Sequence, residues 1–251
     1  MDETGIELAA QLLSEARRER RPLTALPEGA QPRAFAEAAI VQDRIVELTG
    51  ETIAGYKLAG VDPETIMWGA VLASRVFTSP ARIETDLMPM LAMEVEIAFR
   101  LDRDVAADDL DWSAARFDKV VTALPLIEIV DTRFADYNGT PSLHRAADFM
   151  SNGGVVLGAP LAGWRSVDLE RLPVTLSFSG RTVANGIGGH AAGDPRRPAL
   201  AFLASAARNR RLPAGTILTT GTYTRMIYAE RGDRVEADVG PFGKLEVEFS
   251  K

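Results

Sequence analysis

The sequence predicts an α+β protein in which a small helical N-terminal part, residues 1–51, precedes a β-rich domain, residues 52–251. Within residues 3–20 and 33–49 the apolar side chains recur three and four positions apart, which is typical of amphipathic helices. From about residue 52 short alternating apolar runs follow one another, separated by glycine and proline, as strands and turns are. Helices gathered at one end of the chain and strands at the other favour the α+β class.

The elements follow in order along the chain. The first expected helix repeats Ile6, Ala9, Leu13 and Ala16, and the second repeats Phe35, Ala38, Val41, Ile45 and Leu48. We expect a loop over 21–32 between them and further helices over 112–123 and 198–208. The expected strands are TIAGYKLAG, MWGAVLASRVF, MEVEIAFRL, LPLIEIVD, VTLSFSG, GTILTTGTYT, DRVEADV and KLEVEFS. The last two are joined by Gly-Pro-Phe-Gly, which predicts a hairpin with solvent-facing acids at Glu236, Asp238, Glu246 and Glu248.

Composition narrows the function classes. The chain has 251 residues, 46% hydrophobic and 25% charged, which suits one large globular domain or one with a small appendage. A net charge of −7 argues against nucleic acid as a partner. The basic runs ARRERRP and ARNRRLP are interpreted as solvated helix ends. There is no cysteine, no stretch resembling a signal peptide and no apolar run of bilayer length, so we expect a cytoplasmic protein without a membrane partner.

The stretch MEVEIAF carries the strongest chemical signal. Glu94 and Glu96 are two residues apart in an alternating run, so both project from one face of the expected strand. Glu128 is the charge within a second apolar run, LPLIEIVD. Three buried carboxylates at one point would repel one another, and a hard divalent cation, Mg²⁺ or Mn²⁺, is the ligand that such oxygens prefer. The alternative is that Glu94 and Glu96 line the wet face of an edge strand.

Three further segments are candidates for a substrate site. Lys57 lies in an apolar, glycine-flanked strand, where it either meets negative charge on a substrate or extends its amine to solvent at the strand end. Ser151 precedes Asn152 and two glycines, in a turn that either offers polar groups or is an ordinary turn. Thr220 and Gly221 lie among further threonines, where the glycine either admits a ligand or marks a bulge. The glycine-rich GIGGHAAGDP lacks the pattern of a nucleotide-binding loop.

Taken together and in order, several segments resemble the 2-keto-4-pentenoate hydratase and 4-oxalocrotonate decarboxylase group of the fumarylacetoacetate hydrolase superfamily. They are GYKLAG, MEVEIAFRL, LPLIEIVDTRF, AADFMSNGGVVLG, ANGIGG with GDPRRPALAFLA, GTILTTGTYT and GDRVEADVGPFGKLEVEFS. The resemblance implies a β-rich mixed-sheet roll with a small helical N-terminal part. It also implies that Glu94, Glu96 and Glu128 bind Mg²⁺ or Mn²⁺, that Lys57 is catalytic, and that Ser151, Thr220 and Gly221 bind substrate.

The resemblance implies a lyase that adds water to a short 2-hydroxy-2,4-dienoate in aromatic compound catabolism. Decarboxylation of a 2-keto acid is the alternative, because hydratases of this group have an acid in the segment where this chain has Ser74 and Arg75, and an arginine where it has Ala92. A member that binds keto acid and metal without turnover is a third possibility. The family's hydrolases use a histidine near the N-terminus, and no histidine precedes His144 here. We further expect a homo-oligomer, with association with a pathway partner enzyme left open.

Overall fold

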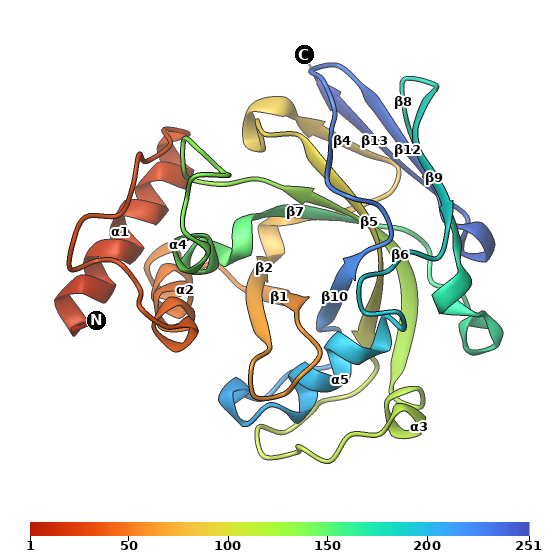
Figure 1. Cartoon of the computed structure of the whole chain (residues 1–251), viewed down its shortest axis with the longest axis horizontal. Helices are drawn as coiled ribbons and strands as arrows, with labels where there is room; N and C mark the ends of the chain where they lie inside the picture. Colours follow the sequence, from red (N-terminus) through yellow and green to blue (C-terminus); the bar gives the residue numbers. More distant parts are fainter. Residues whose placement is uncertain (251) are drawn as a thin grey trace.

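The computed structural model describes residues 1–250, which form two β-sheets flanked by helices (Figure 1). The larger sheet has eight strands in the order β2-β1-β10-β5-β6-β7-β3, with β11 paired to β5. Their bounds are β1 Ile53–Ala59, β2 Met67–Leu72, β3 Val76–Thr78, β5 Ala92–Leu101, β6 Val121–Val130, β7 Asn152–Leu157, β10 Ile217–Thr222 and β11 Ile227–Tyr228. This sheet is strongly curved (Figure 1).

The smaller sheet has five strands in the order β4-β13-β12-β8-β9. Their bounds are β4 Ala81–Glu84, β8 Pro173–Phe178, β9 Arg181–Ile187, β12 Arg234–Asp238 and β13 Lys244–Ser250. The expected C-terminal hairpin is present, because β12 and β13 pair antiparallel with Val235 opposite Val247. Its apolar residues are buried while its four acids are at least partly exposed, as the alternation predicts.

The helices are α1 Glu3–Glu19, α2 Phe35–Thr49, α3 Ala114–Phe117, α4 Ser142–Ala147 and α5 Arg196–Ala204. Short 3₁₀ turns occupy Ala73–Arg75, Thr85–Leu87, Phe149–Ser151, Trp164–Ser166, Leu169–Arg171, Ala206–Arg208 and Gly240–Phe242. Asp2 caps α1 through a 2.8 Å bond from the Gly5 amide, and Gly50 ends α2 in the left-handed conformation. Helices α1, α2 and α4 gather at one end of the molecule, on the side away from the smaller sheet (Figure 1).

The predicted fold class is confirmed, as are the helices over 3–20 and 33–49 and seven of the eight expected strands. The eighth, MWGAVLASRVF, is wrong as a single strand, because the 3₁₀ turn Ala73–Arg75 divides it into β2 and β3, which lie at opposite edges of the larger sheet. The helix expected over 112–123 is wrong for most of its length, because only Ala114–Phe117 is α-helical and Val121 already begins β6. Pairing of β6 with β5 on one side and β7 on the other outweighs the local pattern there. The short helix α4 was not foreseen. Among the described residues, no helix is both long enough and apolar enough to cross a membrane.

The basic runs are solvated only in part. The side chain of Arg17 is 12% exposed and Arg208 is 1% exposed. Arg208 donates hydrogen bonds to the carbonyls of Ala106, Ala107, Asp109, Leu203 and Arg210, which ties two loops to the end of α5. A guanidinium with five donors can satisfy buried carbonyls in this way, so the interpretation as free helix ends is wrong for these two arginines.

Candidate metal centre

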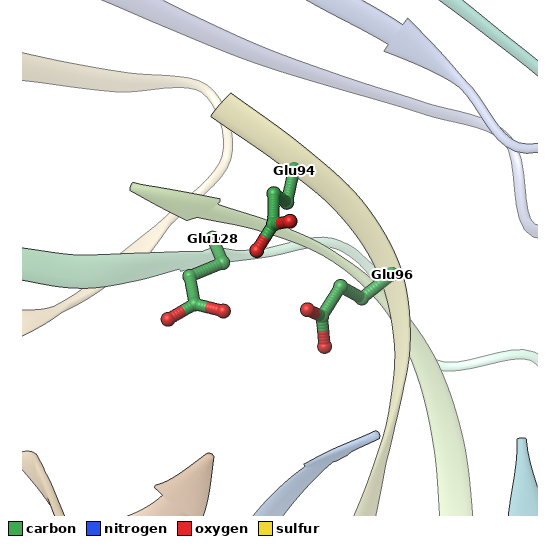
Figure 2. A group of neighbouring side chains, drawn as sticks. All are labelled: Glu94, Glu96 and Glu128. Atoms are coloured by element: carbon green, nitrogen blue, oxygen red, sulfur yellow. The ribbon is translucent and has the colours of Figure 1, made fainter. Parts of the chain in front are cut away.

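The pairing register of β5 and β6 brings two of the predicted acids face to face. Glu94 lies directly opposite Glu128, and Glu96 lies two residues further along β5 on the same face. One carboxylate oxygen from each of the three glutamates lies within 4.8 Å of the others. Figure 2 shows the three side chains turned toward one another from neighbouring strands. The acids therefore converge in the way that the spacing alone could only suggest.

Lys57 completes this cluster from strand β1. Its Nζ lies 3.0 Å from Oε1 of Glu128 and 3.9 Å from Oε2 of Glu94. Two strands, β10 and β5, separate β1 from β6, so in a flat sheet the two backbones would be roughly 14 Å apart. Curvature of the sheet brings the side chains together. Burial acts to lower the pKa of Lys57, but the three carboxylates outweigh it and raise the pKa above its ordinary value.

Glu96 is held by the backbone of β10. It is 1% exposed, and its Oε2 accepts hydrogen bonds from the amides of Thr220 at 3.1 Å and Gly221 at 3.0 Å. Gly221 has φ +100°, a left-handed conformation that aims its amide at the carboxylate and that residues with a side chain rarely adopt. Burial, with repulsion from Glu128 and Glu94, raises the pKa of Glu96 well above its usual range. Burial likewise raises the pKa of Glu94.

Glu128 is fully buried, and its two oxygens differ. Oε1 accepts from Lys57 and, at 2.8 Å, from the side-chain amide of Asn152 at the start of β7. Oε2 has no hydrogen-bond partner among residues 1–250. A buried carboxylate oxygen without a partner is costly unless a ligand meets it. Three hard oxygen donors with one of them unsatisfied fit a divalent cation of the Mg²⁺ or Mn²⁺ kind.

The carboxylates stand beside a small apolar cluster. It is separate from the main hydrophobic core and consists of Val71, Ala98, Leu124, Leu126, Val155 and Ile217. Leu126 is paired with Glu96, and Val155 with Glu128, so these apolar side chains share the face of the acids. The apolar neighbours explain why burial is the leading cause of the raised pKa of Glu96.

Ser151 lies in a strained turn next to the cluster. Phe149, Met150 and Ser151 all have positive φ, at 52°, 52° and 58°. A side chain at Gly69 of β2 would come within 2.1 Å of the Phe149 carbonyl, so only glycine lets this turn approach the sheet. The hydroxyl of Ser151 is buried without a partner in the described part of the chain. Strained left-handed backbone of this kind gathers at ligand sites.

The threonines of β10 divide their roles differently from the expectation. Thr220 contributes its backbone amide to Glu96, while its hydroxyl donates to the Ile97 carbonyl. Thr219 is in register with Lys57 and carries a fully buried hydroxyl with no partner within residues 1–250. Alternation along β10 therefore directs Thr219, rather than Thr220, to the face of Lys57. The sequence shows Thr219 only as a neighbour of Thr220, because the register of β10 with β1 cannot be read from it.

Two positions mark the departures from the hydratase pattern. Ser74 is exposed in the turn after β2, and its hydroxyl donates to Glu51 at 2.6 Å. Ala92 is fully buried and paired with Val130 at the start of β5. Neither residue contributes an acidic or basic group to the carboxylate cluster.

The chain is similar in sequence and in fold to several known proteins. The chain is 28% identical over 264 residues to a 2-keto-4-pentenoate hydratase of Paraburkholderia phymatum, covering 100% of this chain and 99% of the relative. It is 26% identical to a 2-oxo-hept-4-ene-1,7-dioate hydratase of Escherichia coli, covering 96% and 97%. In fold it is similar to 4-oxalocrotonate decarboxylase from Pseudomonas putida G7 complexed with magnesium and adipate, with a TM-score of 0.84, 21% identity and coverage of 99% and 98%.

The family match spans most of the β-rich part. The family described as fumarylacetoacetate (FAA) hydrolase C-terminal matches residues 69–250, a range that contains Glu94, Glu96 and Glu128, whereas Lys57 lies before it. The ordered segments that suggested the superfamily and the two-sheet architecture are in agreement with this match. The chain thus belongs to the fumarylacetoacetate hydrolase C-terminal family.

Proposed function

We propose that the protein is a divalent-metal-dependent lyase that adds water to a short 2-hydroxy-2,4-dienoate of the 2-keto-4-pentenoate type. The observation that carries this proposal is the convergence of Glu94, Glu96 and Glu128 with Lys57 on one face of the curled sheet. The hydratases that align with nearly the whole chain support the reaction class. A 2-keto acid or its enol is a fitting substrate, because adjacent carboxylate and oxygen groups chelate a hard cation.

Glu94, Glu96 and Glu128 would hold Mg²⁺ or Mn²⁺. When bound, the cation supplies Lewis-acid stabilisation of negative charge on the 2-oxygen of the substrate. Asn152 holds the Glu128 carboxylate in place through one oxygen, and the Thr220 and Gly221 amides hold Glu96. These bonds orient the two carboxylates before any ligand arrives, which reduces the ordering required on binding.

The remaining polar groups would handle the substrate. Hydration places a hydroxyl on carbon 4 and protons on carbons 3 and 5, while the enol oxygen loses its proton, so the net addition is one water. Lys57 would meet the negative charge that develops on the enolate oxygen. The unpartnered hydroxyls of Ser151 and Thr219 would position the substrate or the water. Thr220 and Gly221, whose amides donate to Glu96, would line the same pocket.

Decarboxylation of a 2-keto acid is the second candidate. The exposed Ser74 and the buried Ala92 favour it, because both stand where hydratases of the group carry a charged residue. Hydration delivers protons to carbons 3 and 5 and removes protons from the enol hydroxyl and from the attacking water, so the loss of an acid-base group slows it. Decarboxylation needs chiefly stabilisation of the enolate left when CO₂ departs.

A turnover screen tests these alternatives directly. Purified protein with Mg²⁺ or Mn²⁺ is given short 2-hydroxy-2,4-dienoates and 2-keto acids, while loss of the enol absorbance and release of CO₂ are followed together. We expect loss of absorbance without CO₂. Release of CO₂ as the main event would select the decarboxylase, and saturable binding of keto acid with neither signal would select a non-catalytic binding member. Light scattering on the same preparation tests the expected homo-oligomer.

A further inference from the structure

A pocket of about 540 Å³ lies at the end of α1, apart from the carboxylate cluster. It is lined from α1, the end of α2 and the turns on either side of β3 and β4. The lining residues are Gln11, Ser14, Glu15, Arg17, Arg18, Arg20, Leu48, Thr49, Glu51, Arg75 and Leu87. Four arginines face two glutamates here, a net charge of +2 in a chain whose net charge is −7. Such a local reversal of charge attracts anions.

The two less exposed arginines of this pocket, Arg17 and Arg75, are incompletely paired with acids. Arg17 is 12% exposed, and its polar contacts are the Asn152 carbonyl at 3.4 Å and Asp148 at 3.8 Å. Asp148 is already engaged by Arg133, whose Nε donates to it at 2.6 Å. Burial, with repulsion from Arg133, lowers the pKa of Arg17 to about 9. A buried guanidinium without a short ion pair is costly, and a bound anion would relieve that cost.

Arg75 has no ion pair among residues 1–250, and its guanidinium donates to the Leu87 carbonyl at 3.2 Å. The outer arginines are bound only loosely, since Arg18 lies 3.4 Å from Glu19 and Arg20 lies 3.8 Å from Glu84. Most of their donors therefore remain free for a ligand. The C-terminal end of α1 carries negative partial charge, which favours cations in the last turn of that helix. This effect does not account for Arg75, because Arg75 comes from the turn after β2.

We propose that this pocket binds a compact dianion, either a tetrahedral oxyanion of the phosphate type or a small dicarboxylate. Two charges on the ligand match the net charge of the lining, and the planar forks of the arginines suit both oxyanion and carboxylate geometry. The volume is that of a small-metabolite site. None of the lining residues belongs to the carboxylate cluster, so the proposal goes beyond the proposed lyase activity and stands without it.

The test is calorimetric titration of sulfate into the Mg²⁺-loaded protein, with total ionic strength held constant by chloride. We expect saturable binding at one site that Arg75→Gln weakens by about tenfold or more, the loss expected for a hydrogen-bonded charged partner. Arg33→Gln is the matched control, because Arg33 is 77% exposed and outside the pocket. If Arg75→Gln fails to fold, Arg18→Gln replaces it, since that side chain is 68% exposed.

A parallel titration with succinate distinguishes the two classes of dianion, a tetrahedral oxyanion and a small dicarboxylate. Binding of sulfate alone assigns the pocket to a tetrahedral oxyanion, and binding of succinate that Arg75→Gln weakens assigns it to a dicarboxylate. The proposal is overturned if neither anion binds saturably, or if the arginine variant and the Arg33→Gln control bind equally well.

Discussion

Strands β5 and β13 share a local sequence but differ in the burial and in the neighbours of their glutamates. Both contain two glutamates separated by one valine, MEVEI in β5 and LEVEF in β13. In β5, Glu96 is 1% exposed and Glu94 faces Glu128 across the sheet. In β13, the side chains of Glu246 and Glu248 are 37% and 52% exposed. Whether a Glu-x-Glu pair is buried or exposed therefore depends on which strands and side chains cover its face of the sheet, and not on the local sequence.

The partners of the two pairs differ in the same way. Glu246 and Glu248 meet Arg234 and Arg82 at 2.7 and 2.9 Å on the surface, where ion pairs contribute about 0–1 kcal/mol. The acids of β5 and β6 share one lysine, Lys57, whose side chain is 16% exposed, so negative charge exceeds positive charge in a mostly apolar setting. That excess is the physical reason to expect a cation at β5 and none at β13.

The largest difference should appear on neutralising one acid in each strand. Glu96→Gln should weaken Mn²⁺ binding by more than about a hundredfold, because the loss of a ligand charge exceeds the 10–100-fold cost of losing a supporting hydrogen bond. Glu246→Gln, the matched change in β13, should leave Mn²⁺ affinity unchanged. Titration calorimetry on both variants provides the measurement, and equal affinities would return MEVEIAF to the status of an ordinary strand.

Removal of Lys57 should have the next largest effect. Lys57→Met removes the cation that contacts Glu94 and Glu128, so the metal-free variant should lose about 3–5 kcal/mol of unfolding free energy. Mg²⁺ should restore most of that stability, while kcat stays strongly reduced. Lys244→Met, on the exposed start of β13, is the control for stability and activity. A Lys57→Met protein with normal kcat in the presence of Mg²⁺ would make this lysine purely structural.

A smaller effect is expected when a supporting bond is removed. Asn152→Ala deletes the amide that donates to Glu128 at 2.8 Å and should lower metal affinity by roughly 10–100-fold. Asn185→Ala is the control, because its side chain is exposed on β9 and accepts from Thr175. Unchanged Mn²⁺ affinity in Asn152→Ala would show that Glu128 needs no such support.

The smallest effect should come from the surface pair of β13. Glu248→Gln removes an exposed ion pair with Arg82 and should change the free energy of unfolding by less than about 0.5 kcal/mol, as measured by urea denaturation. A loss of several kcal/mol would mean that the β13 acids are structurally as demanding as those of β5.

The sequence could predict the strands and the shared face of Glu94 and Glu96, because a period of two follows from strand geometry alone. It could not predict that Glu128 lies opposite Glu94, since that depends on the register of β5 with β6. The contact of Lys57 with Glu128 was also beyond local reasoning, because it requires the sheet to curl across two intervening strands. The same limit explains why the sequence alone does not place Thr219 on the face of Lys57.

Long-range packing also determines which arginines of the basic runs are exposed to solvent. The spacing in ARRERRP is compatible with a solvated helix end, and Arg18 and Arg20 do remain exposed. Arg17 instead packs over the Phe149 ring, with its guanidinium carbon 5.2 Å from the ring centre. That contact joins α1 to the strained turn before β7, two segments more than a hundred residues apart, and no local pattern encodes it.

The most direct test of the account is a crystal structure of the protein grown with Mn²⁺, with an anomalous difference map calculated for manganese. The account predicts one strong peak bounded by carboxylate oxygens of Glu94, Glu96 and Glu128, with no peak at Glu246 and Glu248. A map without a peak among the first three glutamates, from protein saturated with Mn²⁺, would contradict the metal centre at β5.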